Sequence, residues 1–261
     1  MTDTAEELIL EQDDGLAILR LNRPERLNAL SAGMMQRLSV EVPRLAAAGE
    51  IRAILITGTG RAFCAGGDVG SMSGPADPDA TLSGMRSYHG WLKALRAAEK
   101  PVITAVNGVA AGGGFGIAMI GDVVLGSDAA VFKAGFTDLG AAADYGLAFT
   151  LPRAVGDVRA AGILFSDRRV TAQEALAIGM IAKVFPADSF AADALEFARR
   201  MARTPRGAQL TKRLLRLGEA DAFAQFLEAE ARAQTEAFQS ADFREGVAAF
   251  REKRVPLFRG S

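Results

Sequence analysis

Short apolar runs separated by polar or glycine-containing breaks dominate the first half of the chain. Residues 8–10 and 16–21 are two such runs, and the Asp-Asp-Gly sequence at residues 13–15 lies between them. This arrangement predicts a β-hairpin. Residues 51–57 and 102–106 are short and rich in β-branched side chains, which favours one buried strand in each.

Helical signals alternate with these strands. Ser31 can cap a helix, and Pro43 can interrupt the hydrogen bonding of that helix. In residues 82–99 apolar side chains recur at a helical spacing, which predicts a second helix. Residues 171–174 form a capping box that starts another helix, and Gly179 ends it. The remaining predicted helices comprise residues 188–203, 205–217, 219–239 and 241–254.

The order of these elements indicates one mixed α/β architecture. Short strands are expected near residues 123–125 and 130–132, so the pattern of two strands and a helix recurs. This recurrence predicts a spiral of ββα units. From residue 147 onward the chain is mainly helical. We therefore predict a spiral core in residues 1–200 and a helical C-terminal region in residues 201–261.

Composition and charge fit one globular unit. A chain of 261 residues with 49% hydrophobic and 23% charged residues can bury the core of one domain. The net charge of −1 gives no general attraction to nucleic acid or to an anionic membrane. Cys64 is the one cysteine, which excludes an internal disulfide and fits a reducing cytoplasm. The acidic N-terminal segment lacks the pattern of a signal peptide, so we expect a cytoplasmic protein.

Two segments could suggest a membrane or a nucleic acid as partner, and neither interpretation is favoured. Residues 102–121 carry no charge, but they contain an Asn-Gly turn and six glycines, which predicts a buried strand and a buried helix instead of a membrane span. A cluster of basic residues is more typical of a solvated helical face, balanced by acidic residues elsewhere, than of a nucleic-acid site. Its members are Arg199, Arg200, Arg203, Arg206, Lys212, Arg213 and Arg216.

A run of three glycines, Gly112 to Gly114, separates the strand at residues 102–106 from an apolar helical segment. Glycines at the start of a helix let backbone N–H groups face a ligand, and the helix dipole favours negative charge there. Alone, this turn could stabilise charge on an oxygen, cradle a phosphate or allow close packing. The spacing matches neither the dinucleotide-binding glycine pattern nor the P-loop.

A second glycine-containing segment narrows these alternatives. The strand at residues 51–57 leads into Ala65-Gly66-Gly67, which again leaves backbone amides uncovered. Two strand ends, each with an exposed N–H group, can supply the two donors of an oxyanion hole.

At this point the chain resembles the crotonase, or enoyl-CoA hydratase/isomerase, superfamily. Several independent segments fit the superfamily pattern in order, and together they cover nearly the whole chain. The segments are Leu21-Asn-Arg-Pro-Glu-Arg-Leu-Asn-Ala-Leu30, Phe63-Cys-Ala-Gly-Gly-Asp68, Asn107-Gly-Val-Ala-Ala-Gly-Gly-Gly114, Leu151-Pro-Arg-Ala-Val-Gly156, Gly179-Met-Ile-Ala-Lys-Val184 and Phe243-Arg-Glu-Gly-Val-Ala-Ala-Phe250.

The resemblance implies a crotonase-type spiral that assembles through its C-terminal helices as a homotrimer or a dimer of trimers. It also implies an acyl-CoA thioester as substrate, with coenzyme A as part of that substrate and no separate cofactor. The thioester oxygen would lie between the N–H groups of Gly67 and Gly113. Contacts to the substrate are expected from Arg26, Ala65, Gly66, Gly67, Gly113, Phe136 and, from a neighbouring subunit, Lys253 near Phe250.

The acid and base choose the reaction in this superfamily. A hydratase of the resembling type would carry glutamates at the positions of Gly116 and Phe136, and neither residue can transfer a proton. Related isomerases, including the phenylacetate-pathway epoxide isomerase, place an Asp or Glu at the position of Asp144. A single carboxylate can move a proton between C2 and C4. We therefore expect an isomerase in which Asp144 is the proton shuttle, with apolar neighbours that raise its pKa.

Other functions stay open as alternatives to isomerisation. His89, the one histidine, lies on the apolar side of its helix and is expected to have a structural or pocket-lining role. It matches the water-activating histidine of 4-chlorobenzoyl-CoA dehalogenase, whose aspartate nucleophile matches Asp144, although Phe136 replaces its ring-binding tryptophan. The remaining alternatives are hydratase-like chemistry and a non-catalytic homologue that binds coenzyme A or RNA.

The other candidate residues favour structural interpretations. Asp68 and Asp122 fit superfamily positions that hydrogen-bond nearby backbone, and Asp138 matches no acid of the superfamily. Cys64 follows an aromatic residue in a packed turn and is expected to be a small filler. We expect no metal site, because no group of His, Cys and Asp residues has the spacing of metal ligands.

Overall fold

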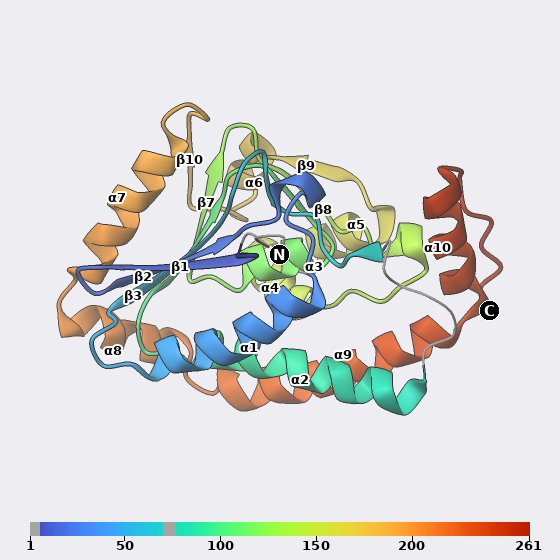
Figure 1. The fold of residues 1–261 in the computed structure, drawn as a ribbon, viewed down its shortest axis with the longest axis horizontal. Helices are drawn as coiled ribbons and strands as arrows, with labels where there is room; N and C mark the ends of the chain where they lie inside the picture. Colours follow the sequence, from blue (N-terminus) through green and yellow to red (C-terminus); the bar gives the residue numbers. More distant parts are fainter. Residues whose placement is uncertain (1–5, 70–76) are drawn as a thin grey trace, which may run out of the picture.

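The computed structural model describes residues 6–69 and 77–261 and contains two sheets (Figure 1). In the larger sheet β1 pairs antiparallel with β2, and every other neighbouring pair is parallel. The spatial order of its strands is β1 (Leu8–Asp13), β2 (Leu16–Leu21), β3 (Ala53–Gly58), β5 (Val102–Val106), β7 (Val123–Ser127) and β10 (Lys183–Phe185). The predicted hairpin and the two predicted buried strands are therefore confirmed.

The smaller sheet turns the fold into a spiral. Its strands are β4 (Ala62–Cys64), β6 (Val109–Ala111), β8 (Val131–Lys133) and β9 (Arg169–Thr171), in that order. The first three are parallel, and each directly follows a strand of the larger sheet, so the chain passes from one sheet to the other in every repeat. The predicted spiral of ββα units is confirmed. The three-residue strands β4 and β6 were not expected, because they are too short for an alternating pattern.

Helices surround this double sheet and form most of the chain after β8. They are α1 (Ala32–Ala47), α2 (Pro78–Ala97), α3 (Gly113–Met119), α4 (Leu147–Val155), α5 (Asp157–Ser166), α6 (Ala172–Ala177), α7 (Phe190–Ala202), α8 (Arg206–Leu215), α9 (Glu219–Gln239) and α10 (Ala241–Glu252). The 3-10 helix η1 (Pro24–Arg26) lies between β2 and α1, and η3 (Thr137–Leu139) lies between β8 and α4.

Helix α1 begins where the sequence predicts but does not break at its proline. The Ser31 hydroxyl accepts a hydrogen bond from the N–H of Met34, which caps the first turn. The helix continues through Pro43 to Ala47. A proline costs one backbone hydrogen bond, and the burial of Val42 and Leu45 on the same helix offsets that loss.

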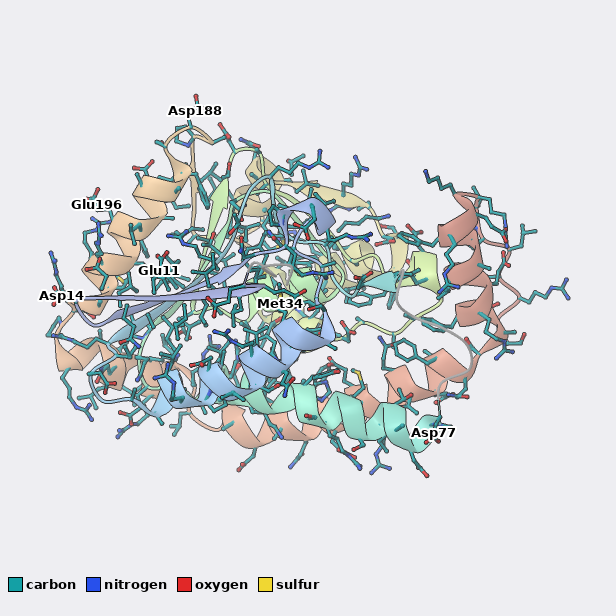
Figure 2. The ribbon with its side chains drawn as sticks, viewed as in Figure 1. Glu11, Asp14, Met34, Asp77, Asp188 and Glu196 are labelled. Carbon is teal, nitrogen blue, oxygen red and sulfur yellow. The ribbon has the colours of Figure 1, made fainter. Side chains whose placement is uncertain are left out.

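Helix α7 covers one face of the larger sheet, and its side chains show why. Phe190, Ala194 and Ala198 recur at helical spacing and pack into a cluster with side chains from β2, β3 and β5. Glu196 points outward from the same helix, as does Asp188 just before it (Figure 2). Opposite faces of one amphipathic helix therefore contact the sheet and the solvent.

Helix α9 crosses the molecule to pack along α2, which itself packs on α1 (Figure 1). The buried residues of α9 are Phe223, Leu227, Glu230, Ala231 and Gln234, which share one face of the helix. Two of these five are polar, which is unusual for a buried face. The division of the chain at residue 200 stays a prediction. Within residues 6–69 and 77–261, no helix is both long and apolar enough to cross a bilayer.

Candidate active site

The two glycine-containing turns lie side by side, one after β4 and the other after β6. Gly112 has φ 52° and Gly66 has φ 90°, conformations that glycine adopts without strain. An ideal Cβ built on Gly66 would lie 2.8 Å from the carbonyl oxygen of Ala111 and 3.3 Å from the nitrogen of Gly113. The backbones of the two turns therefore approach too closely for any side chain at position 66.

The structure brings the two predicted oxyanion donors onto these adjacent turns. Gly67 follows β4, and Gly113 is the first residue of α3. Among the described residues, neither amide N–H donates a hydrogen bond to another part of the chain. Two unused donors on neighbouring backbone segments are what binding of a thioester oxygen requires.

The loop from Gly140 to Gly146 packs against the start of α3 and leaves no room for side chains there. An ideal Cβ on Gly113 would lie 2.5 Å from Cε2 of Tyr145, and one on Gly116 would lie 2.5 Å from Cβ of Tyr145. Tyr145 itself has φ 53°, a rare conformation for a non-glycine residue. The packing of this loop therefore requires a glycine at position 116, because a glutamate there would occupy the volume of Tyr145.

Asp144 lies on this loop with one carboxylate oxygen bound and the other unbound. Its Oδ2 accepts a hydrogen bond of 3.2 Å from Nε2 of Gln234. Its Oδ1 is shielded from solvent and has no hydrogen-bond partner in the described part of the chain. Burial raises the pKa of Asp144 well above its usual value, and the charge of Glu230 raises it further. The hydrogen bond from Gln234 opposes both effects.

Two residues of α9 hold this loop, and neither was predicted from the sequence. Oε1 of Gln234 accepts a hydrogen bond of 2.8 Å from the N–H of Ala142. Oε2 of Glu230 accepts one of 2.9 Å from the N–H of Gly146. The sequence signal was available, because Glu230 and Gln234 lie on the apolar face that Phe223 and Leu227 define. Polar residues on such a face indicate a buried function or contact.

His89 and Glu230 form a buried pair next to Asp144. Nε2 of His89 lies 3.1 Å from Oε1 of Glu230, within ion-pair distance but outside hydrogen-bond geometry. Burial lowers the pKa of His89 to about 4, the nearby Lys93 lowers it further, and Glu228 acts in the opposite direction. Burial raises the pKa of Glu230 to about 8, although hydrogen bonds from the N–H groups of Gly146 and Tyr145 act to lower it. His89 is therefore neutral at pH 7.

The predicted coenzyme A contacts fall into separate groups. Arg26 is exposed on η1, and the neighbouring residue Leu27 accepts a backbone hydrogen bond of 3.0 Å from Ala65. This pairing brings Arg26 next to the turn of Gly66 and Gly67. Phe136 is buried in the main core, one residue before η3.

Lys253 lies apart from this group. It is exposed and ends α10 at one end of the molecule (Figure 1). Its predicted role concerned a neighbouring subunit and stays a prediction.

The remaining candidates have structural partners. Asp122 accepts from the N–H of Val102 at 2.9 Å and pairs with Lys212 at 2.6 Å. Asp138 pairs with Lys133 on the surface, and Asp68 pairs with Arg23. Cys64 is buried, and burial raises the pKa of its thiol to about 12, so it fits a small filler of the core. No metal-binding group of His, Cys, Asp and Glu residues occurs in the described ranges.

Most members of the basic cluster at residues 199–216 form ion pairs with carboxylates. Arg199 and Arg203 pair with Asp13 and Asp14 at the tip of the hairpin, and Arg213 pairs with Glu99. The exposed arginines fit the solvated helical face that the sequence favours. For Lys212 that expectation is wrong, because its side chain is buried against Asp122.

Comparisons with known proteins agree with this geometry. The sequence profile of the enoyl-CoA hydratase/isomerase family matches residues 11–261. A probable enoyl-CoA hydratase of Rhodobacter capsulatus is 41% identical over 96% of both chains. The 1,2-epoxyphenylacetyl-CoA isomerase of Escherichia coli K12 is 39% identical over 97% of this chain and 99% of its own. The crystal structure of an enoyl-CoA hydratase from Mycobacterium avium subsp. paratuberculosis superposes with a TM-score of 0.88 at 30% identity, covering 97% of this chain and 99% of that one.

Proposed function

This chain belongs to the enoyl-CoA hydratase/isomerase family, and we propose that it is an acyl-CoA isomerase with Asp144 as its proton shuttle. The substrate is a thioester in which a double bond shifts or a ring epoxide is isomerised. The observation that carries the proposal is the environment of Asp144, a single carboxylate with Oδ2 held by Gln234 and Oδ1 unbound.

The proposed chemistry begins at the thioester. Its carbonyl oxygen binds between the N–H groups of Gly67 and Gly113, which stabilise the negative charge that develops when a proton leaves C2. The loss of one such donor raises a barrier by about 3–4 kcal/mol in other enzymes. Because both donors belong to the main chain, glycine serves at these positions by leaving them accessible.

Proton transfer is assigned to the unbound oxygen of Asp144. For a 3-enoyl thioester, Oδ1 removes the proton from C2, and the electron pair delocalises onto the thioester oxygen. The same oxygen then returns the proton to C4, which yields the 2-enoyl thioester without addition of water. A base shielded from solvent binds a proton more strongly than an exposed one, which matches the raised pKa of Asp144.

Hydration fits the site less well. The two positions at which hydratases of this family carry glutamates are Gly116 and Phe136 in this chain. Glu230 is a second carboxylate near Asp144, but its side chain is only 1% exposed, and it contacts Gly146 and His89. The names of the similar proteins include both a hydratase and an isomerase, so the choice of isomerase rests on these residues.

The assembly is also proposed from the family. We infer a homotrimer or a dimer of trimers, with coenzyme A as part of the substrate and no separate cofactor. Leu214, Leu217 and Phe165 are each more than 70% exposed in the single chain. Large exposed apolar side chains of this kind fit burial between subunits.

An Asp144→Asn variant tests the proposal. We expect it to lose about 10²–10⁴-fold in the isomerisation of a trans-3-enoyl-CoA or a ring-epoxide thioester, because the amide cannot accept the proton. Asp138→Asn, on the same segment but exposed and paired with Lys133, is the matched control and keeps its activity.

Other outcomes identify the alternatives. Unchanged turnover in Asp144→Asn would refute the assignment of the proton shuttle. A wild-type protein that binds thioesters but turns over none of them would indicate a non-catalytic homologue. Turnover confined to 4-chlorobenzoyl-CoA would indicate the dehalogenase.

A further inference from the structure

Glu230 is a buried carboxylate to which the proposed function assigns no role. It lies on α9, yet it contacts two other parts of the fold: the N–H of Gly146 on the loop of Asp144 and Nε2 of His89 on α2. Only 5% of the residue is exposed. A carboxylate is among the side chains least often buried in this way, because its charge loses the solvation of water.

Anchoring of the loop alone does not require a carboxylate. A glutamine at position 230 would offer the same acceptor oxygen to the N–H of Gly146 without an ionisable group, as Gln234 does one turn later for Ala142. What a glutamate adds is a second titrating carboxyl group beside Asp144.

We propose that Glu230 is a positioning residue that acts through Asp144: it anchors the loop of Asp144 to α9 and holds a second carboxyl group close to that loop. This inference rests on the proposed function, in which Asp144 is the proton shuttle. Glu230 itself does not contact the reacting carbons, because its oxygens face Gly146 and His89.

The charged and titratable groups around Glu230 support a net effect on Asp144. Helix α2 contributes His89, with Lys93 and Tyr88 nearby; α9 contributes Glu228; and the loop contributes Asp144 and Tyr145. His89 is neutral at pH 7, so it does not neutralise an ionised Glu230. Lys93 and Glu228 act on His89 with opposite signs. Glu230, whose pKa is about 8, becomes charged only above that pH, and the neutral His89 does not balance the charge there.

The direction of the effect follows from electrostatics. Above about pH 8, where Glu230 is ionised, its charge disfavours a second negative charge on Asp144 and raises the pKa of Asp144 beyond the effect of burial. Glu230→Gln removes that charge and keeps an acceptor for Gly146. The pKa of Asp144 should then fall, and the acid limb of the pH profile of kcat/KM should move to lower pH.

The experiment measures the Asp144 carboxyl in two independent ways. The carboxyl ¹³C resonance of Asp144, assigned by its absence in Asp144→Asn, is titrated in wild type and in Glu230→Gln, and the pH profile of kcat/KM is recorded for both. We expect both midpoints to fall by about one pH unit or more, a tenfold or larger change in proton affinity. Glu228→Gln is the matched control on the same helix, and its midpoints should equal those of wild type.

A second variant separates charge from anchoring. Glu230→Asp keeps the charge but shortens the reach to Gly146, so kcat should fall while the midpoint stays near that of wild type. Equal midpoints in wild type and Glu230→Gln would overturn the inference even if both variants lower the melting temperature. The titration decides the inference whether or not the protein turns over a substrate, whereas absence of turnover in wild type refutes only the proposed function.

Discussion

Replacement of Gly116 by alanine tests how closely the Asp144 loop packs on α3. The ideal Cβ at this position lies 2.5 Å from Cβ of Tyr145 and 3.0 Å from the carbonyl oxygens of Asp144 and Tyr145. Carbon atoms in van der Waals contact are about 3.5–4.0 Å apart, so the loop must move by about 1 Å. The atoms in the way belong to the backbone and to a Cβ, so rotation of a side chain cannot relieve the contact.

The magnitude follows from this displacement. Overpacking of this kind costs about 1–3 kcal/mol of the free energy of unfolding. For a chain of this size each kcal/mol lowers Tm by about 2–4 °C. A shift of about 1 Å in a catalytic group can lower turnover by about 10²-fold, so Gly116→Ala should lose activity beyond its loss of stability.

Thermal melts and steady-state isomerisation assays measure both effects. Gly162→Ala on α5 is the matched control, because an ideal Cβ there has no neighbour within 4 Å. It should keep its activity and gain up to about 1 kcal/mol from helix propensity. If Gly116→Ala were as stable and as active as wild type, the loop of Asp144 would not pack on α3 as described.

Two further predictions concern buried ionisable side chains. Lys212→Met removes the cation that pairs with Asp122 at 2.6 Å and donates a hydrogen bond to the carbonyl of Lys100. Chemical denaturation should show that the free energy of unfolding falls by about 3 kcal/mol. Arg213→Met, which removes an exposed ion pair with Glu99, should change the free energy of unfolding little. The pKa of His89 is lowered to about 4, so between that pH and about 6.5 the unfolded chain binds a proton that the folded chain does not. Stability should therefore fall as pH drops through this window, by about 2 kcal/mol from His89 at pH 5; His89→Gln should lose this part of the pH dependence, and an unchanged dependence would contradict the assignment.

Local signals made much of the fold predictable from the sequence. The hairpin of β1 and β2 follows from an Asp-Asp-Gly break between apolar runs, and the cap of α1 follows from Ser31, because each depends on residues that are close in the chain. Strand β6 was missed because three residues cannot show a period. The sequence left open whether Pro43 interrupts α1, because tertiary packing of the neighbouring residues, which no local pattern shows, outweighs the loss of one hydrogen bond.

In the candidate site, too, the features that depend on local sequence were predictable and those that depend on distant contacts were not. The turns of Gly67 and Gly113 were predicted from their glycine-rich sequences and from the resemblance to the crotonase superfamily, both of which depend on local segments. The contacts of Glu230 and Gln234 with the loop join residues more than 80 positions apart, and no local pattern specifies such a pairing. The remaining sequence signal was that two polar side chains occupy the apolar face of a helix.

The ratio of two wild-type rates tests the central claim most directly. One preparation is assayed for isomerisation of a trans-3-enoyl-CoA and for hydration of crotonyl-CoA. Gly116 and Phe136 cannot transfer a proton, and loss of one proton-transfer group costs about 10²–10⁴-fold, so hydration should be slower than isomerisation by at least that factor or undetectable. Hydration at a rate equal to or above that of isomerisation would show that another residue delivers the proton, and it would contradict the assignment of Asp144 as the single proton shuttle.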